Sequence, residues 1–236
     1  MTRGEMKLRA RSLILTNPPR PHPCLVTLAL LAFIWIVNYL AQKIGGQPIL
    51  IDLNAVEALD YENMIRIELS NTEFVPTAIL LLFQLVFIIL SYGYTAYTLH
   101  VVRGEPSGYG NLLDGFGIAW RAVALTLLID ALVMVASVAL LVPGLILSYA
   151  YGMAPYLQVD HPDWSPIRCM RESRIMMRGH KWDLFVLQLS FLGWQILATI
   201  PGVSVFVKPY VSLTETVFYE NLRASNPQLP VDFQKS

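Results

Sequence analysis

Residues 118–142 read IAWRAVALTLLIDALVMVASVALLV, and after Pro143-Gly144 the apolar composition resumes in LILSYAYGMAPYLQV, residues 145–159. A helix needs about 20 predominantly apolar residues to cross the roughly 30 Å hydrocarbon core of a bilayer. The first run reaches that length and the second falls short of it. Proline cannot continue a helix, and glycine accepts the φ angles of a tight reversal. The pair therefore predicts a helical hairpin inside a membrane.

Further apolar runs lie on both sides of this pair. They predict membrane spans at 25–41, 75–102, 184–200 and 203–219, in addition to 118–142 and 145–159. Ile200-Pro201-Gly202 repeats the joint seen at Val142-Pro143-Gly144. The predicted fold is an all-α, polytopic membrane protein with about six membrane helices arranged as three hairpins. For the short fourth run, a kinked helix or a re-entrant pair that does not fully cross is the alternative.

The composition agrees with a membrane protein. Hydrophobic residues make up 55% of the chain and charged residues only 14%, whereas soluble domains carry about 25% charged residues. Charges are scarce in spanning helices because they are costly to place in hydrocarbon. The formal net charge is zero, so we expect no nucleic-acid partner. The run at 25–41 is preceded by basic residues, but no small-x-small cleavage site follows it, which favours a retained span over a signal peptide.

Lysine and arginine divide unequally between the two sides of the predicted spans, 14 against 3. The larger set is Arg3, Lys7, Arg9, Arg11, Arg20, Arg103, Arg121, Arg168, Arg171, Arg174, Arg178, Lys181, Arg223 and Lys235, and the smaller is Lys43, Arg66 and Lys208. Because positive charge is retained in the cytoplasm, both termini are predicted to be cytoplasmic. The domains expected are a basic N-terminal segment at 1–24, a membrane domain at 25–222 with an acidic external loop at 42–74, and a cytoplasmic tail at 223–236.

Each predicted hairpin follows an amphipathic stretch on the cytoplasmic side, at 6–15, 109–120 and 165–182. In the last of these, Ser165 is a good N-cap and Pro166 suits the first helical position. A continuous helix would align the basic residues Arg171, Arg174, Arg178 and Lys181 on one stripe. We interpret this stripe as a binding face for anionic lipid headgroups or for a partner protein. An ordinary solvated loop helix is the alternative interpretation.

The stretch from Pro143 to Trp194 resembles a bacterial membrane family known as domain of unknown function 975. The resemblance is carried by the Pro-Gly joint, Ser-Tyr-x-x-x-Met-Ala-Pro-Tyr (148–156), Arg-Glu-Ser-Arg (171–174), Arg-Gly-His-Lys-Trp (178–182) and Leu-Ser-Phe-Leu-Gly-Trp (189–194). MKLRARSLI at 6–14 and FYENL at 218–222 extend it more loosely. The proline-rich NPPRPHP before the first span and the acidic external loop depart from the family pattern. The resemblance implies a multi-pass protein of the bacterial plasma membrane, and it implies no catalytic residue or substrate.

Two carboxylates fall inside predicted spans. Asp130 lies at the middle of the third span and Glu215 in the sixth. A carboxylate at the bilayer centre costs about 2.5–3.5 kcal/mol on insertion scales, so it usually faces a partner or a cavity. For Asp130 we expect a hydrogen bond that packs helices, with Lys208 and Gln195 as candidate partners. A proton or substrate site of a transporter is the alternative.

No residue set has the spacing of a catalytic or metal site. Asp160, His161 and Asp163 could combine with His180 in a hydrolase acting on lipid headgroups, although Asp-His-Pro-Asp also suits a turn. Cys24 and Cys169 lack paired spacing, and both fall on the predicted cytoplasmic side, so we expect no disulfide and no zinc site.

The leading functional hypothesis is a non-enzymatic scaffold or accessory module in the plasma membrane. Its expected partners are membrane lipids, another envelope protein or a second copy of the chain, and it would need no cofactor. The alternatives are a small transporter or permease subunit using Asp130 and Glu215, and a lipid-directed enzyme.

Overall fold

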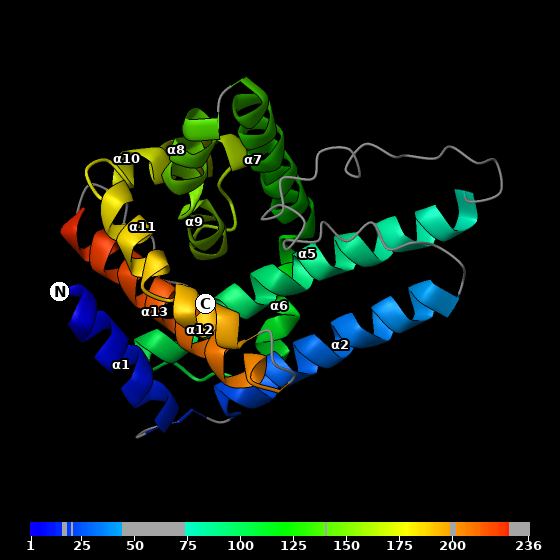
Figure 1. Cartoon of the computed structure of the whole chain (residues 1–236), viewed down its shortest axis with the longest axis horizontal. Coiled ribbons are helices and arrows are strands. Elements are labelled where there is room, and N and C mark those ends of the chain that lie inside the picture. Colours follow the sequence, from blue (N-terminus) through cyan, green and yellow to red (C-terminus); the bar gives the residue numbers. More distant parts are fainter. Residues whose placement is uncertain (16–17, 20, 44–73, 140, 199–201, 227–236) are drawn as a thin grey trace. The chain divides into compact units, whose positions relative to one another are not determined.

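The computed structural model of the chain describes residues 1–15, 18–19, 21–43, 74–139, 141–198 and 202–226. Every regular element in these ranges is helical (Figure 1). The elements are α1 (Arg3–Leu15), α2 (Pro23–Lys43), α5 (Phe74–Arg103), the 3₁₀ helix η1 (Tyr109–Leu112), α6 (Asp114–Gly117), α7 (Ala119–Ala139), α8 (Leu141–Tyr151), α9 (Ala154–Asp160), α10 (Pro166–Met176), α11 (Lys181–Leu189), α12 (Leu192–Leu197) and α13 (Ser204–Ser225). The predicted all-α class is confirmed for this part of the chain.

The chain divides into two compact units. The smaller, Leu30–Phe87, holds the C-terminal part of α2 and the N-terminal part of α5, and in it Trp35 stacks on Tyr39 with 5.8 Å between ring centroids. The larger comprises Met1–Ala29 and Ile88–Ser236. It contains every site described below.

Two helices in the described ranges are long and apolar enough to cross a membrane. They are Leu81–Arg103 within α5 and Ala119–Val138 within α7, and Pro23–Phe33 is a shorter apolar helix. The first two coincide with the spans predicted at 75–102 and 118–142. The spans predicted at 145–159 and 184–200 are interrupted, because α8 ends at Tyr151 before α9 begins, and α11 ends at Leu189 before α12 begins. Most of the loop predicted at 42–74 lies outside the described residues.

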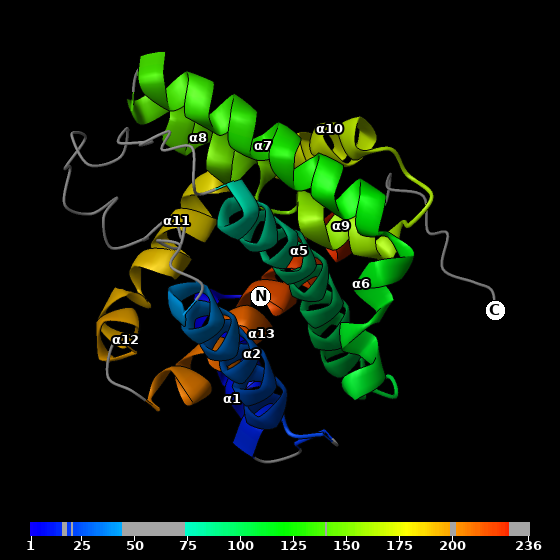
Figure 2. The same cartoon turned by 90° about the vertical axis from the view of Figure 1, so that its right-hand side faces the viewer.

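The joint at Pro143-Gly144 does not lie where the sequence suggested. Both residues belong to the first turn of α8, and the boundary with α7 precedes them. Proline is tolerated in a first turn, because the N–H that it lacks would have no partner there. α7 and α8 nevertheless pack side by side (Figure 2). In the second joint, Gly202 has a φ of 89°, whereas Ile200 and Pro201 lie outside the described residues.

The helix predicted at 165–182 is shorter than expected. It starts as predicted, since the Ser165 side chain accepts a hydrogen bond from the backbone N–H of Arg168 and Pro166 occupies the first turn. It ends at Met176, and Gly179 adopts a φ of 81° before α11 starts at Lys181. A left-handed residue ends an α-helix. The prediction of one helix, and hence of one stripe of four basic residues, is therefore wrong in its last third.

The stretch predicted at 109–120 also differs from a single helix. It consists of η1, the single turn of α6 and the start of α7. At the N-terminus a regular helix does cover the predicted stretch, since α1 runs from Arg3 to Leu15 with Met6, Ala10 and Ile14 buried.

The core of the larger unit forms around α13. α1 lies along this helix (Figure 1). The largest fully buried side chains come from α5, α7, α9, α10, α11 and α13 and the segments beside them, and they are Tyr97, Leu99, Leu125, Met153, Leu157, Met176, Met177, Leu184, Leu187, Phe191, Leu213 and Tyr219. The polar groups described next are placed by this packing.

Candidate functional site

A cluster of charges, half-buried apart from the fully buried Asp160, joins the C-terminal ends of α5 and α9 to the last turns of α13. An Nη atom of Arg103 lies 2.8 Å from Oδ2 of Asp160 and 2.6 Å from Oε1 of Glu220. Arg223 lies 3.8 Å from carboxylate oxygens of both acids. The Tyr219 hydroxyl donates to Oδ2 of Asp160 at 2.5 Å. Two guanidinium groups and two carboxylates thus neutralise one another at the meeting point of three helices.

Asp160 is the most deeply buried member of this charge cluster, with its side chain 1% exposed. A buried carboxylate is tolerated only when it is paired and hydrogen-bonded, and Asp160 has both kinds of partner. No buried side-chain nitrogen or oxygen in the described ranges lacks a hydrogen-bond partner. The charge cluster therefore satisfies its own charges and links α5, α9 and α13 to one another.

Polar contacts continue from the charge cluster along α13. Thr216 donates to the Thr98 hydroxyl of α5 at 3.0 Å. The ring of Tyr156 stacks on that of Tyr219 with 5.1 Å between centroids. Further along, Gln188 of α11 donates to Glu215 at 2.9 Å. α13 thus presents a polar row to its neighbours within the packed unit.

The two intramembrane candidates are not brought together. Glu215 is half-buried and hydrogen-bonded to Gln188. Asp130 is exposed on α7 and makes no hydrogen bond or ion pair with another residue that the structure describes. No hydrogen bond or ion pair in the described ranges joins Asp130 to either expected partner, Lys208 on α13 or Gln195 on α12.

The predicted basic stripe divides into two parts. Arg171 and Arg174 are exposed on α10, Arg178 is exposed in the turn after it, and Lys181 begins α11. Arg168 joins the exposed side of α10, with its guanidinium 4.0 Å from the centre of a Trp164 ring. The opposite side of the helix, with Cys169, Met170, Ser173 and Met176, is buried against the protein.

The loop proposed for catalysis has structural contacts instead. Asp160 belongs to the charge cluster, and the His161 ring stacks on Trp164 with 3.8 Å between centroids. His180 lies beside Asp183, with 3.3 Å between Nδ1 and Oδ2. The described residues contain no group of three or more His, Cys, Asp or Glu side chains placed to hold a metal ion. Cys24 and Cys169 are buried free thiols, and burial raises the pKa of Cys169 to about 12.

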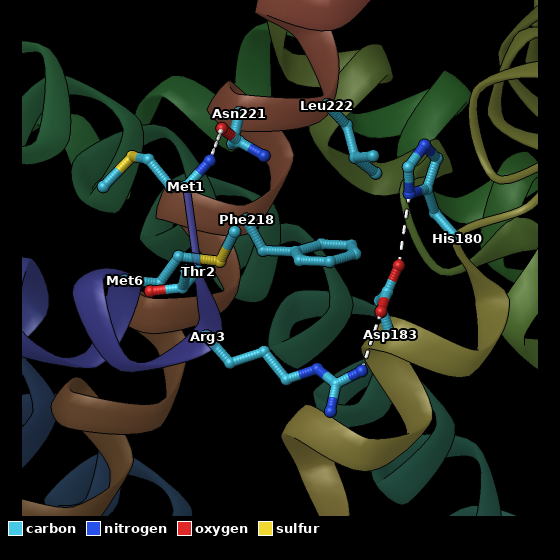
Figure 3. A pocket seen from close by; sticks show the side chains of 9 residues that line it. All are labelled: Met1, Thr2, Arg3, Met6, His180, Asp183, Phe218, Asn221 and Leu222. Carbon is cyan, nitrogen blue, oxygen red and sulfur yellow. Dashed lines mark hydrogen bonds and ion pairs between the residues drawn. The ribbon is translucent and has the colours of Figure 1, made fainter.

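An open pocket of about 490 Å³ lies between the start of α1, the start of α11 and the end of α13 (Figure 3). At its rim, Arg3 donates to Oδ1 of Asp183 at 2.8 Å, which chiefly holds the pKa of that carboxyl below its usual value. Phe218 and Leu222 line it from α13. The pocket and its ion pair show how α1 is held at its first turn.

The sequence alone did not point to the charge cluster. The sequence marks Arg103 and Arg223 only as cytoplasmic charges, and Glu220 only as part of the motif FYENL. The signal available was weak, since Glu220 and Arg223 are spaced i, i+3 on one helix face. Arg103 is 117 residues from its partner Glu220, and Asp160 is 59 residues from its partner Tyr219, so only folding brings them together.

Comparison with known proteins supports one assignment. No curated protein and no solved structure matches the chain. A family model described as a protein of unknown function, DUF975, matches residues 121–226. These residues run from the start of α7 to the end of α13, and they include every member of the charge cluster except Arg103. The resemblance recognised from the sequence motifs is thereby confirmed: residues 121–226 match the DUF975 family model.

Proposed function

We propose that this protein is a non-enzymatic scaffold or accessory module of the bacterial plasma membrane, with both termini in the cytoplasm and six membrane segments in three hairpins. Its partners in this proposal are membrane lipids and either another envelope protein or a second copy of the chain. The short α8–α9 and α11–α12 segments enter the membrane as broken helices.

The observation that carries this proposal is the outward face of α7. Its exposed side chains include Leu127, Leu128, Leu132, Met134, Val135 and Val138. A helix face that exposes so many large apolar side chains is uncommon on soluble monomers, and it marks interaction with a membrane or a partner. The hydrocarbon core of a bilayer would remove these side chains from water, which is energetically favourable for apolar groups.

The polar groups support a scaffold over an enzyme. The charge cluster is internally neutralised, and its carboxylates already have partners. A catalytic acid or base needs a proton that it can exchange with a substrate. The lipid-directed enzyme, which needed Asp160 to Asp163, accordingly ranks third.

A transporter remains the second candidate because of Glu215. Its hydrogen bond to Gln188 lies next to the interruption between α11 and α12. Interrupted membrane helices often form ion and substrate sites in transporters. A phenotype that is lost in both Glu215→Gln and Asp130→Asn, while each variant still inserts normally, would favour the transporter over the scaffold.

The membrane topology tests the proposal directly. In intact cells, an impermeant thiol reagent should label a cysteine placed at Asn54 and spare one placed at Ser225. After permeabilisation both should react, because Ser225 is at the exposed end of α13. Native Cys24 and Cys169 are buried, so the unsubstituted chain is the background control. Labelling of Ser225→Cys alone in intact cells, or release of the chain by alkaline carbonate, would contradict the proposal.

A further inference from the structure

We propose that the outward side of α10 is a docking surface for the anionic lipid headgroups of the cytoplasmic leaflet. This side consists of Ile167, Arg168, Arg171, Arg174 and Ile175, continued by Arg178 in the following turn. The inference rests on the proposed membrane location and names the surface that contacts the leaflet.

One side of α10 is exposed and the other is buried in the protein. At 3.6 residues per turn, the five exposed residues share one side of the helix, and Cys169, Met170, Ser173 and Met176 share the other. The second group is buried against α7, α8 and α9 (Figure 2). A free amphipathic helix would insert this apolar side into lipid. Here the protein already covers it, so only the basic side can meet a membrane.

The exposed side carries more positive charge than its neighbours neutralise. Arg168 lies over the Trp164 ring at 4.0 Å, and Arg171 lies 3.2 Å from Glu172. Arg174 and Arg178 add two further guanidinium groups on the same side. Guanidinium groups bind phosphate oxygens through two parallel hydrogen bonds, which makes a phosphate-bearing surface the complementary partner.

Apolar side chains among these arginines favour a lipid surface over an acidic protein. Ile167 is 71% exposed, and Trp182, at the start of α11, is 67% exposed. An exposed isoleucine among arginines, followed by an exposed tryptophan at the start of the next helix, suits the boundary between headgroups and acyl chains. An exposed isoleucine gains nothing from a solvated acidic surface, because it stays in water there.

The position of α10 also fits the boundary of the bilayer. Arg121, in the first turn of α7, donates to the backbone carbonyl of Pro162, a few residues before α10. Trp120 beside it is exposed. The segment leading into α10 therefore lies level with the cytoplasmic end of the span predicted at 118–142.

Depth-dependent quenching tests the surface in the full chain reconstituted in vesicles. An apolar fluorophore on Ile167→Cys should be quenched by lipids brominated near the headgroup when phosphatidylglycerol is present, and weakly in pure phosphatidylcholine. Each cation near an anionic leaflet changes affinity by about fivefold. The triple variant R168Q/R171Q/R174Q should therefore weaken the affinity of this surface for anionic lipid by roughly a hundredfold. The charge-preserving variant R168K/R171K/R174K should retain most of that affinity. Raising the ionic strength from about 0.01 M to about 1 M shortens the Debye length from about 30 Å to about 3 Å and should abolish the quenching.

A fluorophore on Leu8→Cys is the matched control, because Leu8 is 65% exposed on α1, away from these arginines. Equal quenching in neutral vesicles, or none in anionic ones, would overturn the proposal, and the second result would assign the basic side to a protein partner. The same samples are also extracted with alkaline carbonate. If the chain stays in the membrane, only the docking proposal has failed; if it is released, the membrane proposal has failed as well.

Discussion

Asp160 accepts a hydrogen bond from Tyr219 and forms an ion pair with Arg103, while only 1% of its side chain is exposed. Removing one partner from a buried ion pair costs more than the pair contributes, because the remaining charge stays buried. The stability of the three-helix junction therefore depends on this carboxylate more than on any charge at the surface.

Asp160→Asn should lower the free energy of unfolding by roughly 3 kcal/mol, at the low end of the range for a broken buried pair. In a chain of this size that corresponds to a decrease of about 6–12 °C in Tm, measurable by thermal unfolding in detergent. Glu172→Gln is the control, because it breaks the pair with Arg171, whose side chain is 68% exposed, and a pair at the surface is worth about 0–1 kcal/mol. Equal shifts in the two variants would show that the charge cluster does not clamp the helices.

The ion pair between Asp183 and Arg3 should make the attachment of α1 dependent on pH. Its hydrogen bond with Arg3 holds the pKa below the usual value near 3.8, although burial opposes the shift. A carboxyl that is more acidic in the folded protein stabilises it above the usual pKa, and this stabilisation is lost as the pH falls through the lowered value. The first turn of α1 should therefore loosen as the pH drops below about 4.

Amide hydrogen exchange in α1, corrected for intrinsic rates, measures this loosening between about pH 5 and about pH 3. Asp183→Asn should show weak protection at both pH values, because the pair with Arg3 is absent throughout. If the variant keeps the wild-type response to pH, another group controls the docking of α1.

At the scale of elements, α5 and the η1–α6 segment approach each other at the backbone. A Cβ atom added at Gly93 would lie 2.0 Å from the carbonyl oxygen of Leu112, and one at Gly115 would lie 2.1 Å from that of Ile89. Backbone atoms cannot move aside as a flexible side chain can. These two glycines set the distance between the segments.

Gly93→Ala should therefore destabilise the protein by about 1–3 kcal/mol or more through overpacking, despite the better helix propensity of alanine. Gly117→Ala is the control, since a Cβ there meets nothing within 4 Å, and its effect should stay within about 1 kcal/mol. Thermal unfolding of both variants provides the comparison. A Gly93→Ala variant as stable as the control would mean that the segments pack less closely.

At the scale of the whole molecule, the packing of the region that matches the DUF975 model includes a residue outside the matched range. Arg103, at the end of α5, neutralises Asp160 and Glu220 of that region. α1 adds a second contact through Arg3 and through the apolar residues Met6, Ala10 and Ile14. The N-terminal helices thus participate in the fold of the matched region.

Local signals in the sequence were sufficient for several features of this protein. Apolar run length predicted helices at 75–102 and 118–142, because a long apolar segment can bury its backbone polar groups only by forming helix. Ser165-Pro166 predicted the start of α10, because capping depends on neighbouring residues alone. The motifs between Pro143 and Trp194 identified the family, since they record local geometry in a short stretch.

Only the tertiary structure decided the rest. It ended α10 at Met176 and directed its apolar side inward, although the residue pattern also allowed a longer helix lying on lipid. It assembled Arg103, Asp160, Glu220 and Arg223, which are spread over three helices. Periodicity shows that a helix has a polar side and an apolar side, but which surface each side meets depends on how distant segments pack, and no local pattern contains that information.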